Sequence, residues 1–150
     1  MIVHKYRLCK TSWGIAINIY GNVFDYDRYN SKVYVMENNH LTKICEGLYV
    51  LFDKEQNRNV GPNHSYNQMQ VDDYSYMIEG LLKVSGKIKE NTEYQNTLIV
   101  ITRLEFSLCD FQEEGLIAGM MEWAAKAFDF TCPHIEVKYQ KDINKYLYEL

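Results

Sequence analysis

The segment from Asp110 to Phe130 constrains the fold of this 150-residue chain more than any other. Asp110 can accept hydrogen bonds from the free N–H groups of a first helical turn, and Glu113 follows three residues later, as a capping box requires. Apolar residues form a wide stripe along one side of the expected helix: Leu116, Met120, Trp123, Ala124 and Ala127. Small residues such as Gly115 and Gly119 indicate that another backbone packs closely. The segment therefore predicts a buried, structural helix over 110–130.

Four strands are expected before residue 53, because apolar and polar residues alternate there with a period of two. They are predicted at 2–9, 12–20, 32–37 and 44–52. Gly21-Asn22 is expected to end the second strand, and Gly47 to form a bulge in the fourth. The segment that follows, 53–70, is polar and lacks a period. A connection of that length is commonly functional or mobile.

The second half of the chain predicts a helix over 73–89, capped by Asp72 or Asp73, and then a strand at 98–108. That strand is apolar on both faces at its start, as is typical of the centre of a sheet. Pro133 is expected to stop the 110–130 helix, and strands at 134–140 and 146–148 to end the chain. These elements predict one α+β domain over 1–150, a two-layer sandwich in the order β-β-β-β-α-β-α-β-β. Its sheet is expected to be mostly antiparallel, with two helices on one face.

Composition excludes several classes of protein. Apolar residues make up 47% of the chain and charged residues 24%, which is normal for a globular protein. No run approaches the roughly 20 apolar residues that a membrane span needs. The N-terminus alternates like a strand and lacks the core of a signal peptide, so cytoplasmic residence is expected. The four cysteines are widely spaced and are expected to be free, buried thiols: Cys9, Cys45, Cys109 and Cys132.

Charge is spread unevenly along the chain. Residues 91–150 carry ten Asp+Glu and five Lys+Arg, a balance of −5, within a total net charge of −4. Neutralising phosphates requires Lys and Arg, so this half argues against nucleic-acid binding. An acidic surface is better suited to a basic protein partner.

No residue pattern predicts a catalytic centre, a cofactor or a metal site. The four histidines are scattered, and Cys132-Pro133-His134 lacks a second pair of ligands. Cys109 precedes the expected helix, but the carboxylates of Asp110 and Glu113 oppose any lowering of its thiol pKa by the helix. Neighbouring carboxylates elsewhere are explained more simply as turn formers and helix caps than as acid–base pairs. The chain is therefore expected not to be an enzyme.

Protein binding is the function that these residues favour. The chain has 13 tyrosines, and tyrosine offers a rigid contact surface with a polar tip. Many of them are also explained as strand residues. The expected partner-binding residues lie on or beside connections and combine carboxylates with tyrosines: Asp25, Tyr26, Asp27, Tyr29, Glu55, Asp72, Asp73, Tyr74 and Tyr76.

Two resemblances accompany these residues. The order of several strands, helix, strand and helix resembles the ribosomal protein S5 domain 2-like fold, which implies an arrangement of elements but no function. A small, acidic, tyrosine-rich domain without catalytic residues resembles the immunity proteins of bacterial toxin–immunity systems, including contact-dependent growth inhibition. That resemblance implies tight binding to a cognate basic toxin, often a nuclease, whose active site is covered by acidic residues.

The sequence thus predicts a cytoplasmic inhibitor of a basic, nuclease-type toxin, acting as a monomer or dimer. One alternative is a small enzyme or ligand-binding domain with a groove near the 53–71 loop. A second is an RNA- or ribosome-associated domain, which follows from the fold resemblance and against which the acidic charge argues.

Overall fold

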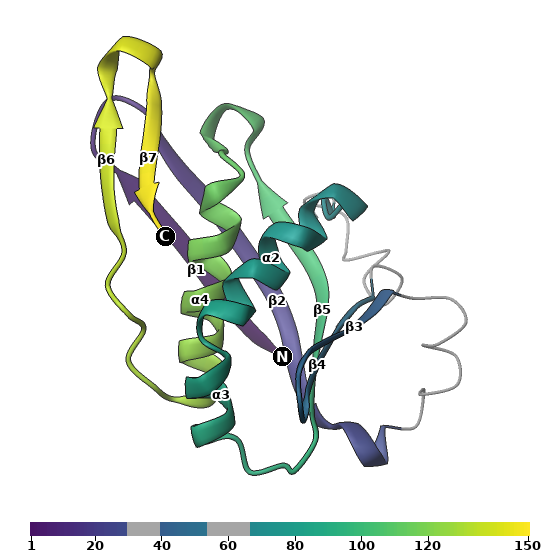
Figure 1. Cartoon of the computed structure of the whole chain (residues 1–150). Helices are drawn as coiled ribbons and strands as arrows, with labels where there is room; N and C mark the ends of the chain where they lie inside the picture. The colour runs from purple at the N-terminus through teal and green to yellow at the C-terminus, as the bar shows by residue number, and fades with distance from the viewer. Residues whose placement is uncertain (30–39, 54–66) are drawn as a thin grey trace.

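The computed structural model describes residues 1–29, 40–53 and 67–150, and the predicted strand at 32–37 lies outside them. The described residues form an α+β fold with two open sheets (Figure 1). The larger sheet has the order β1-β2-β5-β4-β3. Its strands are β1 (Ile2–Cys9), β2 (Gly14–Asp25), β3 (His40–Cys45), β4 (Leu48–Phe52) and β5 (Thr97–Phe106). The β4–β5 pair is parallel and the other pairs of this sheet are antiparallel. The prediction of a mostly antiparallel sheet is therefore confirmed.

The second strand does not end at Gly21, contrary to prediction. β2 continues to Asp25, and its register with β5 shifts between Tyr20 and Gly21. A Cβ atom on Gly21 would lie 2.8 Å from side-chain atoms of both Ile101 and Trp123. The glycine is therefore required by close packing against the core, and the strand continues through it.

The predicted strand at 44–52 contains the end of one strand, a turn and a second strand. β3 ends at Cys45 and β4 begins at Leu48, with Gly47 between them at φ +81. This left-handed conformation is one that L side chains rarely adopt, so glycine permits a tight hairpin here rather than a bulge in one long strand.

Two helices replace the single helix predicted at 73–89. They are α2 (Val71–Lys83) and α3 (Ser85–Asn91), separated by Val84, whose ψ of 12 interrupts the helical geometry. Val84 and Ile88 are buried in the core, so α3 still packs against the rest of the domain. All the described α-helices cover the same face of the large sheet (Figure 1).

The long helix, α4, runs over Glu114–Phe128, four residues shorter at its start than predicted. The predicted cap at Asp110 is wrong, because residues Leu108–Asp110 form a 3-10 turn and Glu113 precedes the helix without a side-chain cap bond. The helix ends at Asp129, which adopts φ 57, before Pro133 is reached. No helix in the described part of the chain is long and apolar enough to cross a membrane.

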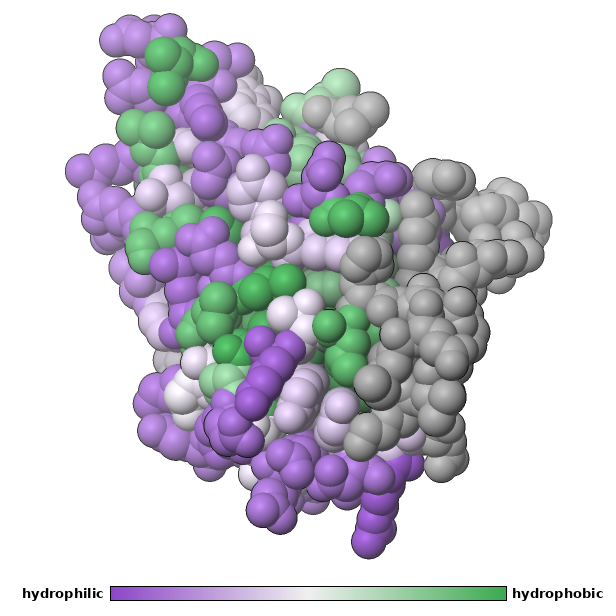
Figure 2. Space-filling view, turned by 45° about the vertical axis from the view of Figure 1, so that its right-hand side comes forward, coloured by the Kyte–Doolittle hydropathy of each residue, from purple (hydrophilic) through white to green (hydrophobic). Residues whose placement is uncertain are grey.

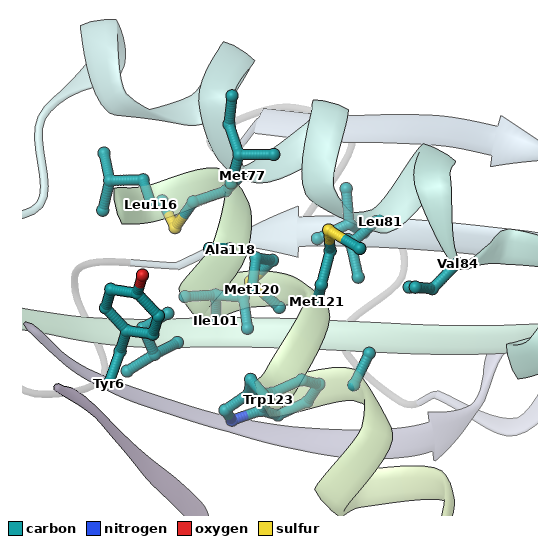
Figure 3. Close-up of a cluster of buried hydrophobic side chains, with 14 of the residues drawn as sticks. Tyr6, Met77, Leu81, Val84, Ile101, Leu116, Ala118, Met120, Met121 and Trp123 are labelled. Atoms are coloured by element: carbon teal, nitrogen blue, oxygen red, sulfur yellow. The ribbon is translucent and has the colours of Figure 1, made fainter. Parts of the chain in front are cut away.

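Small residues allow the two layers to approach closely. A Cβ on Gly80 of α2 would lie 2.5 Å from the carbonyl oxygen of Ile117 in α4, so these helix backbones nearly touch. Gly115 and Gly119 face the sheet instead, against isoleucines of β2 and Tyr6. Figure 3 shows the core between the layers, where Met77, Leu81, Ile101, Met120 and Trp123 are fully buried. The predicted close packing of small residues is confirmed.

The C-terminal strands form a separate two-stranded sheet, β6 (Glu136–Gln140) and β7 (Lys145–Glu149). Gln112 connects this hairpin to the start of α4, because its amide bonds both the N–H and the carbonyl oxygen of Tyr146. Trp13 packs edge-on against Tyr146 at 4.9 Å, and the hydroxyls of Tyr6 and Tyr148 are 2.9 Å apart. The hairpin is thus held to the domain by side chains rather than by a strand ladder.

Candidate functional site

One predicted binding segment lies where β2 ends and the chain turns into the short 3-10 helix η1 (Tyr26–Arg28). The carboxylate of Asp25 caps this turn by accepting from the N–H of Asp27 at 3.1 Å. Tyr26 N–H donates to the carbonyl oxygen of Asn96, and the Asn96 amide donates to the Asp27 carboxylate at 3.0 Å. These bonds hold the turn against the loop that precedes β5 and fix the positions of both carboxylates.

The two tyrosines of this segment are anchored on the face of the sheet that carries no helix. Tyr26 stacks on Tyr49 with ring centroids 4.1 Å apart, and Tyr29 packs on Phe24 at 5.0 Å. These rings cover buried residues of β4 and β5, namely Leu51, Leu98 and Val100. Tyr26 and Tyr29 remain half-buried, so part of each ring is accessible on a rigid support.

The structure adds acidic residues that sequence reasoning missed. Glu93 is exposed, and its carboxylate accepts a hydrogen bond from Tyr94. This bond raises the pKa of Tyr94, and the negative charge of Asp25 contributes further. Glu93 and Tyr94 line a cavity of about 380 Å³ together with Asp129, which follows the end of α4. The sequence signal that could have found Glu93 is its place beside Tyr94 in the polar stretch between the expected helix and strand.

We call this surface the acidic end and define it by six residues: Asp25, Tyr26, Asp27, Glu93, Tyr94 and Asp129. Three segments of the chain contribute to it. Two cations of the same region, Arg28 and Lys89, already make contacts. Arg28 lies 3.8 Å from Asp25, whereas Lys89 donates to the backbone carbonyls of Gly47 and Gln95. The acidic end therefore combines accessible carboxylates with tyrosine rings on a supported surface.

The second predicted group, at the start of α2, has a structural role in large part. Asp73 is 9% exposed and accepts from the N–H of Gln70 at 2.9 Å, which caps the helix. Tyr74 is 9% exposed and stacks on Phe52 at 4.2 Å. Burial raises its pKa, and the charges of Asp73 and Asp53 add to this shift. Little of either side chain is accessible to a partner.

Asp72 and Tyr76 are the accessible members of that second group. Asp72 is exposed and Tyr76 is half-buried against the core. Figure 1 places the start of α2 at the opposite end of the sheet from η1, so the structure does not join the two predicted groups into one surface. Glu55 and most of the 53–71 loop lie outside the described residues.

A second cavity, of about 460 Å³, lies between β1, α4 and the segment 132–137. His4 and Glu122 meet there, with Nε2 and Oε1 2.8 Å apart. Cys132 also lines it, but burial and the charge of Glu122 raise the pKa of its thiol to about 11. A thiol that stays protonated at neutral pH is a poor nucleophile, so this cavity lacks an activated cysteine.

The described residues also bear on possible metal ligands and on the cysteines. There, no group of three His, Cys, Asp or Glu side chains could hold a metal ion. All four cysteines are free, but the prediction that they are buried is wrong: Cys9 and Cys109 are exposed, and Cys45 and Cys132 are half-buried. The reason is that the first two lie at the end of a strand and in a 3-10 turn, outside the core.

Hydrophobic side chains also gather on one face of the molecule. Figure 2 shows them near the middle of the view, with hydrophilic residues around them. Val71 and Leu82 of α2 are among the exposed large apolar residues. Apolar patches with such a surround are typical of protein–protein contact sites.

The fold and the acidic end together define a two-layer α+β domain with an acidic, tyrosine-bearing surface. No protein family, curated protein or solved structure matches the chain.

Proposed function

We propose that the chain is a protein-binding inhibitor, in the manner of an immunity protein that neutralises a basic, nuclease-type toxin in the bacterial cytoplasm. The observation that carries this proposal is the acidic end. Asp25 and Asp27 flank Tyr26, whose ring stacks on Tyr49 of the sheet, and Glu93 and Asp129 line a cavity with Tyr94. The charge of Asp25 acts on Tyr94, so the two parts lie close together. Tyrosine anchors with neighbouring acids are suited to a partner surface rich in Lys and Arg.

The arrangement also accounts for how such a surface would gain affinity. Asp25 and Asp27 are held by capping and by Asn96 before any partner arrives, so little side-chain entropy is lost on binding. Accessible carboxylates steer a basic partner and raise its association rate, an effect that falls with ionic strength. A nuclease that binds phosphates carries the complementary positive charge in its active site.

The test begins with the gene next to this one, where a toxin reading frame is expected. Co-expression of the chain should protect cells from that toxin, and the purified proteins should form a tight complex whose association slows as salt is added. The variants Asp27→Lys and Glu93→Lys should each weaken the complex at least about tenfold. Glu79→Lys, an exposed site on α2, is the matched control and should change affinity little.

Two results would overturn the proposal. One is the absence of both a complex and protection with any toxin encoded beside the gene. The other is a complex that Asp27→Lys and Glu93→Lys weaken no more than Glu79→Lys does, because binding would then take place away from the acidic end.

A further inference from the structure

The outer edge of β1 leaves main-chain hydrogen-bonding groups open. β1 is the last strand of the five-stranded sheet and pairs with β2 on its other side. In β5, the main-chain N–H groups of Leu104 and Phe106 donate to the side chains of Asn67 and Gln68. These two N–H groups therefore point away from β2. On β2, Ile19 lies opposite Leu104 and Ile17 lies opposite Phe106. The main-chain groups of these isoleucines therefore point toward β1, where they pair with His4 and Tyr6.

Alternation then fixes which groups of β1 face outward. Because His4 and Tyr6 bond to β2, the N–H and carbonyl groups of Lys5 and Arg7 point away from the sheet. The open stretch is limited at both ends, since Lys126 donates to Val3 O at 2.6 Å and Lys10 N–H donates to the Tyr146 hydroxyl at 3.0 Å. Between these limits, no described residue bonds the main-chain groups of Lys5 or Arg7.

A groove follows this open edge. It is the cavity of about 460 Å³, lined by residues 4 and 6–8 of β1 and by residues 132–135 and 137. Arg7 belongs to this lining, although its guanidinium bonds Asn18 of β2. Ala118 and Glu122 of α4 also line it. Figure 1 shows the chain before β6 running along this side of the molecule, set apart from β1. Residues of β1 and of the segment 132–137 thus line one cavity, and beyond β1 the sheet has no further strand among the described residues.

The carboxylate of Glu122 determines which kind of side chain the groove favours. The carboxylate of Glu122 is 38% exposed and meets only the imidazole of His4 among the described ion pairs. Its charge is felt across the groove, since it contributes to raising the pKa values of Cys132 and Tyr6, although burial is the larger cause for both. Lys126, one helical turn away, is engaged with Val3. A cation entering the groove would therefore meet a carboxylate without a Lys or Arg partner.

We propose that this groove binds an extended segment of another protein, which adds to the edge of β1 as a sixth strand and directs a Lys or Arg side chain toward Glu122. Main-chain bonds to Lys5 and Arg7 supply affinity, and alternate side chains supply specificity. Side chains of the bound strand opposite Tyr6 enter the groove. Those opposite Lys5 and Arg7 lie on the other face, where acidic residues are favoured.

A second copy of this chain fits the edge less well than such a segment. Two antiparallel β1 edges would bring the Lys5 and Arg7 side chains of both copies onto one face, and like charges in that position are destabilising. The inference goes beyond the proposed function and does not rest on the acidic end, which lies elsewhere on the molecule.

The experiment selects peptides of about eight residues, the length of β1, from a randomised display library on the immobilised protein. Selected peptides should carry a Lys or Arg at the position that faces Glu122, with acidic residues favoured at the alternate positions. Their binding should raise the protection of the Lys5 and Arg7 amides from hydrogen exchange about tenfold or more. Glu122→Gln should weaken binding about tenfold, because it removes the charge and keeps the shape. Glu79→Gln is the matched control and should leave affinity unchanged.

A second variant tests the edge itself. Lys5→Pro removes an N–H that points outward, so the β1–β2 ladder is kept while pairing with a peptide is blocked. Circular dichroism would verify that this variant folds, and peptide binding should then be lost. The inference is overturned if no peptide is enriched, if enriched peptides lack the cation that faces Glu122, or if binding survives Glu122→Gln and Lys5→Pro undiminished. It is also overturned if the protein alone dimerises in solution and Lys5→Pro makes it monomeric, because a second copy would then occupy the edge.

Discussion

Gln112 joins the start of α4 to the C-terminal hairpin through a single buried amide. Its two bonds to Tyr146 satisfy an N–H and a carbonyl oxygen that water does not reach. Gln112→Ala would leave both groups unpaired, and we expect the free energy of unfolding to fall by about 2–4 kcal/mol. Urea unfolding measures this loss. Gln140→Ala, at an exposed position, should change stability by less than about 0.5 kcal/mol, and equal losses would contradict the assigned role.

Cys132 should react with alkylating agents more slowly than the two exposed cysteines, Cys9 and Cys109. With a pKa of about 11 instead of 9.0, its thiolate fraction at pH 8 is about a hundredfold smaller. We expect alkylation at that pH to modify the exposed Cys9 and Cys109 well before Cys132, as followed by peptide mass spectrometry. Glu122→Gln should speed the reaction of Cys132 only modestly, since burial is the larger cause. Modification of Cys132 as fast as Cys9 would refute this.

Glycines show why the sequence predicted some residues wrongly. At a strand-like position, a glycine signals that no Cβ fits, but not whether the reason is a left-handed backbone or a close neighbour. Gly47 has a left-handed backbone and Gly21 has close neighbours, whereas the sequence predicted a bulge at Gly47 and the end of a strand at Gly21. The distinction depends on Ile101 and Trp123, which are far from Gly21 in sequence.

At the scale of elements, α2 and α3 offer a comparison of two helical glycines, Gly80 and Gly86. Gly80→Ala would place a Cβ 2.5 Å from the carbonyl oxygen of Ile117, and we expect it to destabilise the protein by about 1–3 kcal/mol. Gly86→Ala meets nothing within 4 Å and should stabilise it by about 0.5–1 kcal/mol through helix propensity. Thermal unfolding of both variants measures the difference. If Gly80→Ala did not destabilise the protein, the α2–α4 approach would not be as close as described, and destabilisation by Gly86→Ala would contradict the open space around Gly86.

Most elements were predictable because their apolar periods reflect one buried face. The strand at 2–9 and the core of the 110–130 helix follow directly from this. Their ends were less predictable, since the cap expected at Asp110 competes with a 3-10 turn, and that turn depends on where Gln112 must reach Tyr146. Boundaries are set by tertiary contacts that no local pattern contains.

The candidate site was predictable only in its contiguous part. Asp25 to Tyr29 combine acids and tyrosines within five residues, so local reasoning finds them. Glu93 and Asp129 come from separate segments, and only the packing of α4 against the sheet brings them to the same cavity. Conversely, Asp73 and Tyr74 looked like a binding pair but are used for capping and stacking.

For the whole molecule, the paired hydroxyls of Tyr6 and Tyr148 predict a loss of stability in alkali. Burial raises the pKa of Tyr6 from 10.0 to about 12 and that of Tyr148 also upward. The folded state therefore keeps phenol protons that the unfolded chain releases, so the free energy of unfolding should fall as pH rises from about 10 to about 12. Urea titrations across this range would measure the slope. Tyr6→Phe should make the slope shallower, and an unchanged slope would contradict the prediction.

The position of β5 has a consequence for how the chain folds. β5 lies between β2, encoded near the start of the chain, and β4, so the centre of the sheet joins segments that are far apart in sequence. Such non-local pairing slows folding, and we expect a folding time of milliseconds to seconds. On the ribosome, the β1–β2 and β3–β4 hairpins would emerge with unpaired edges and wait until Phe106 had been made. During synthesis, then, this protein is most exposed to aggregation before its central strand arrives.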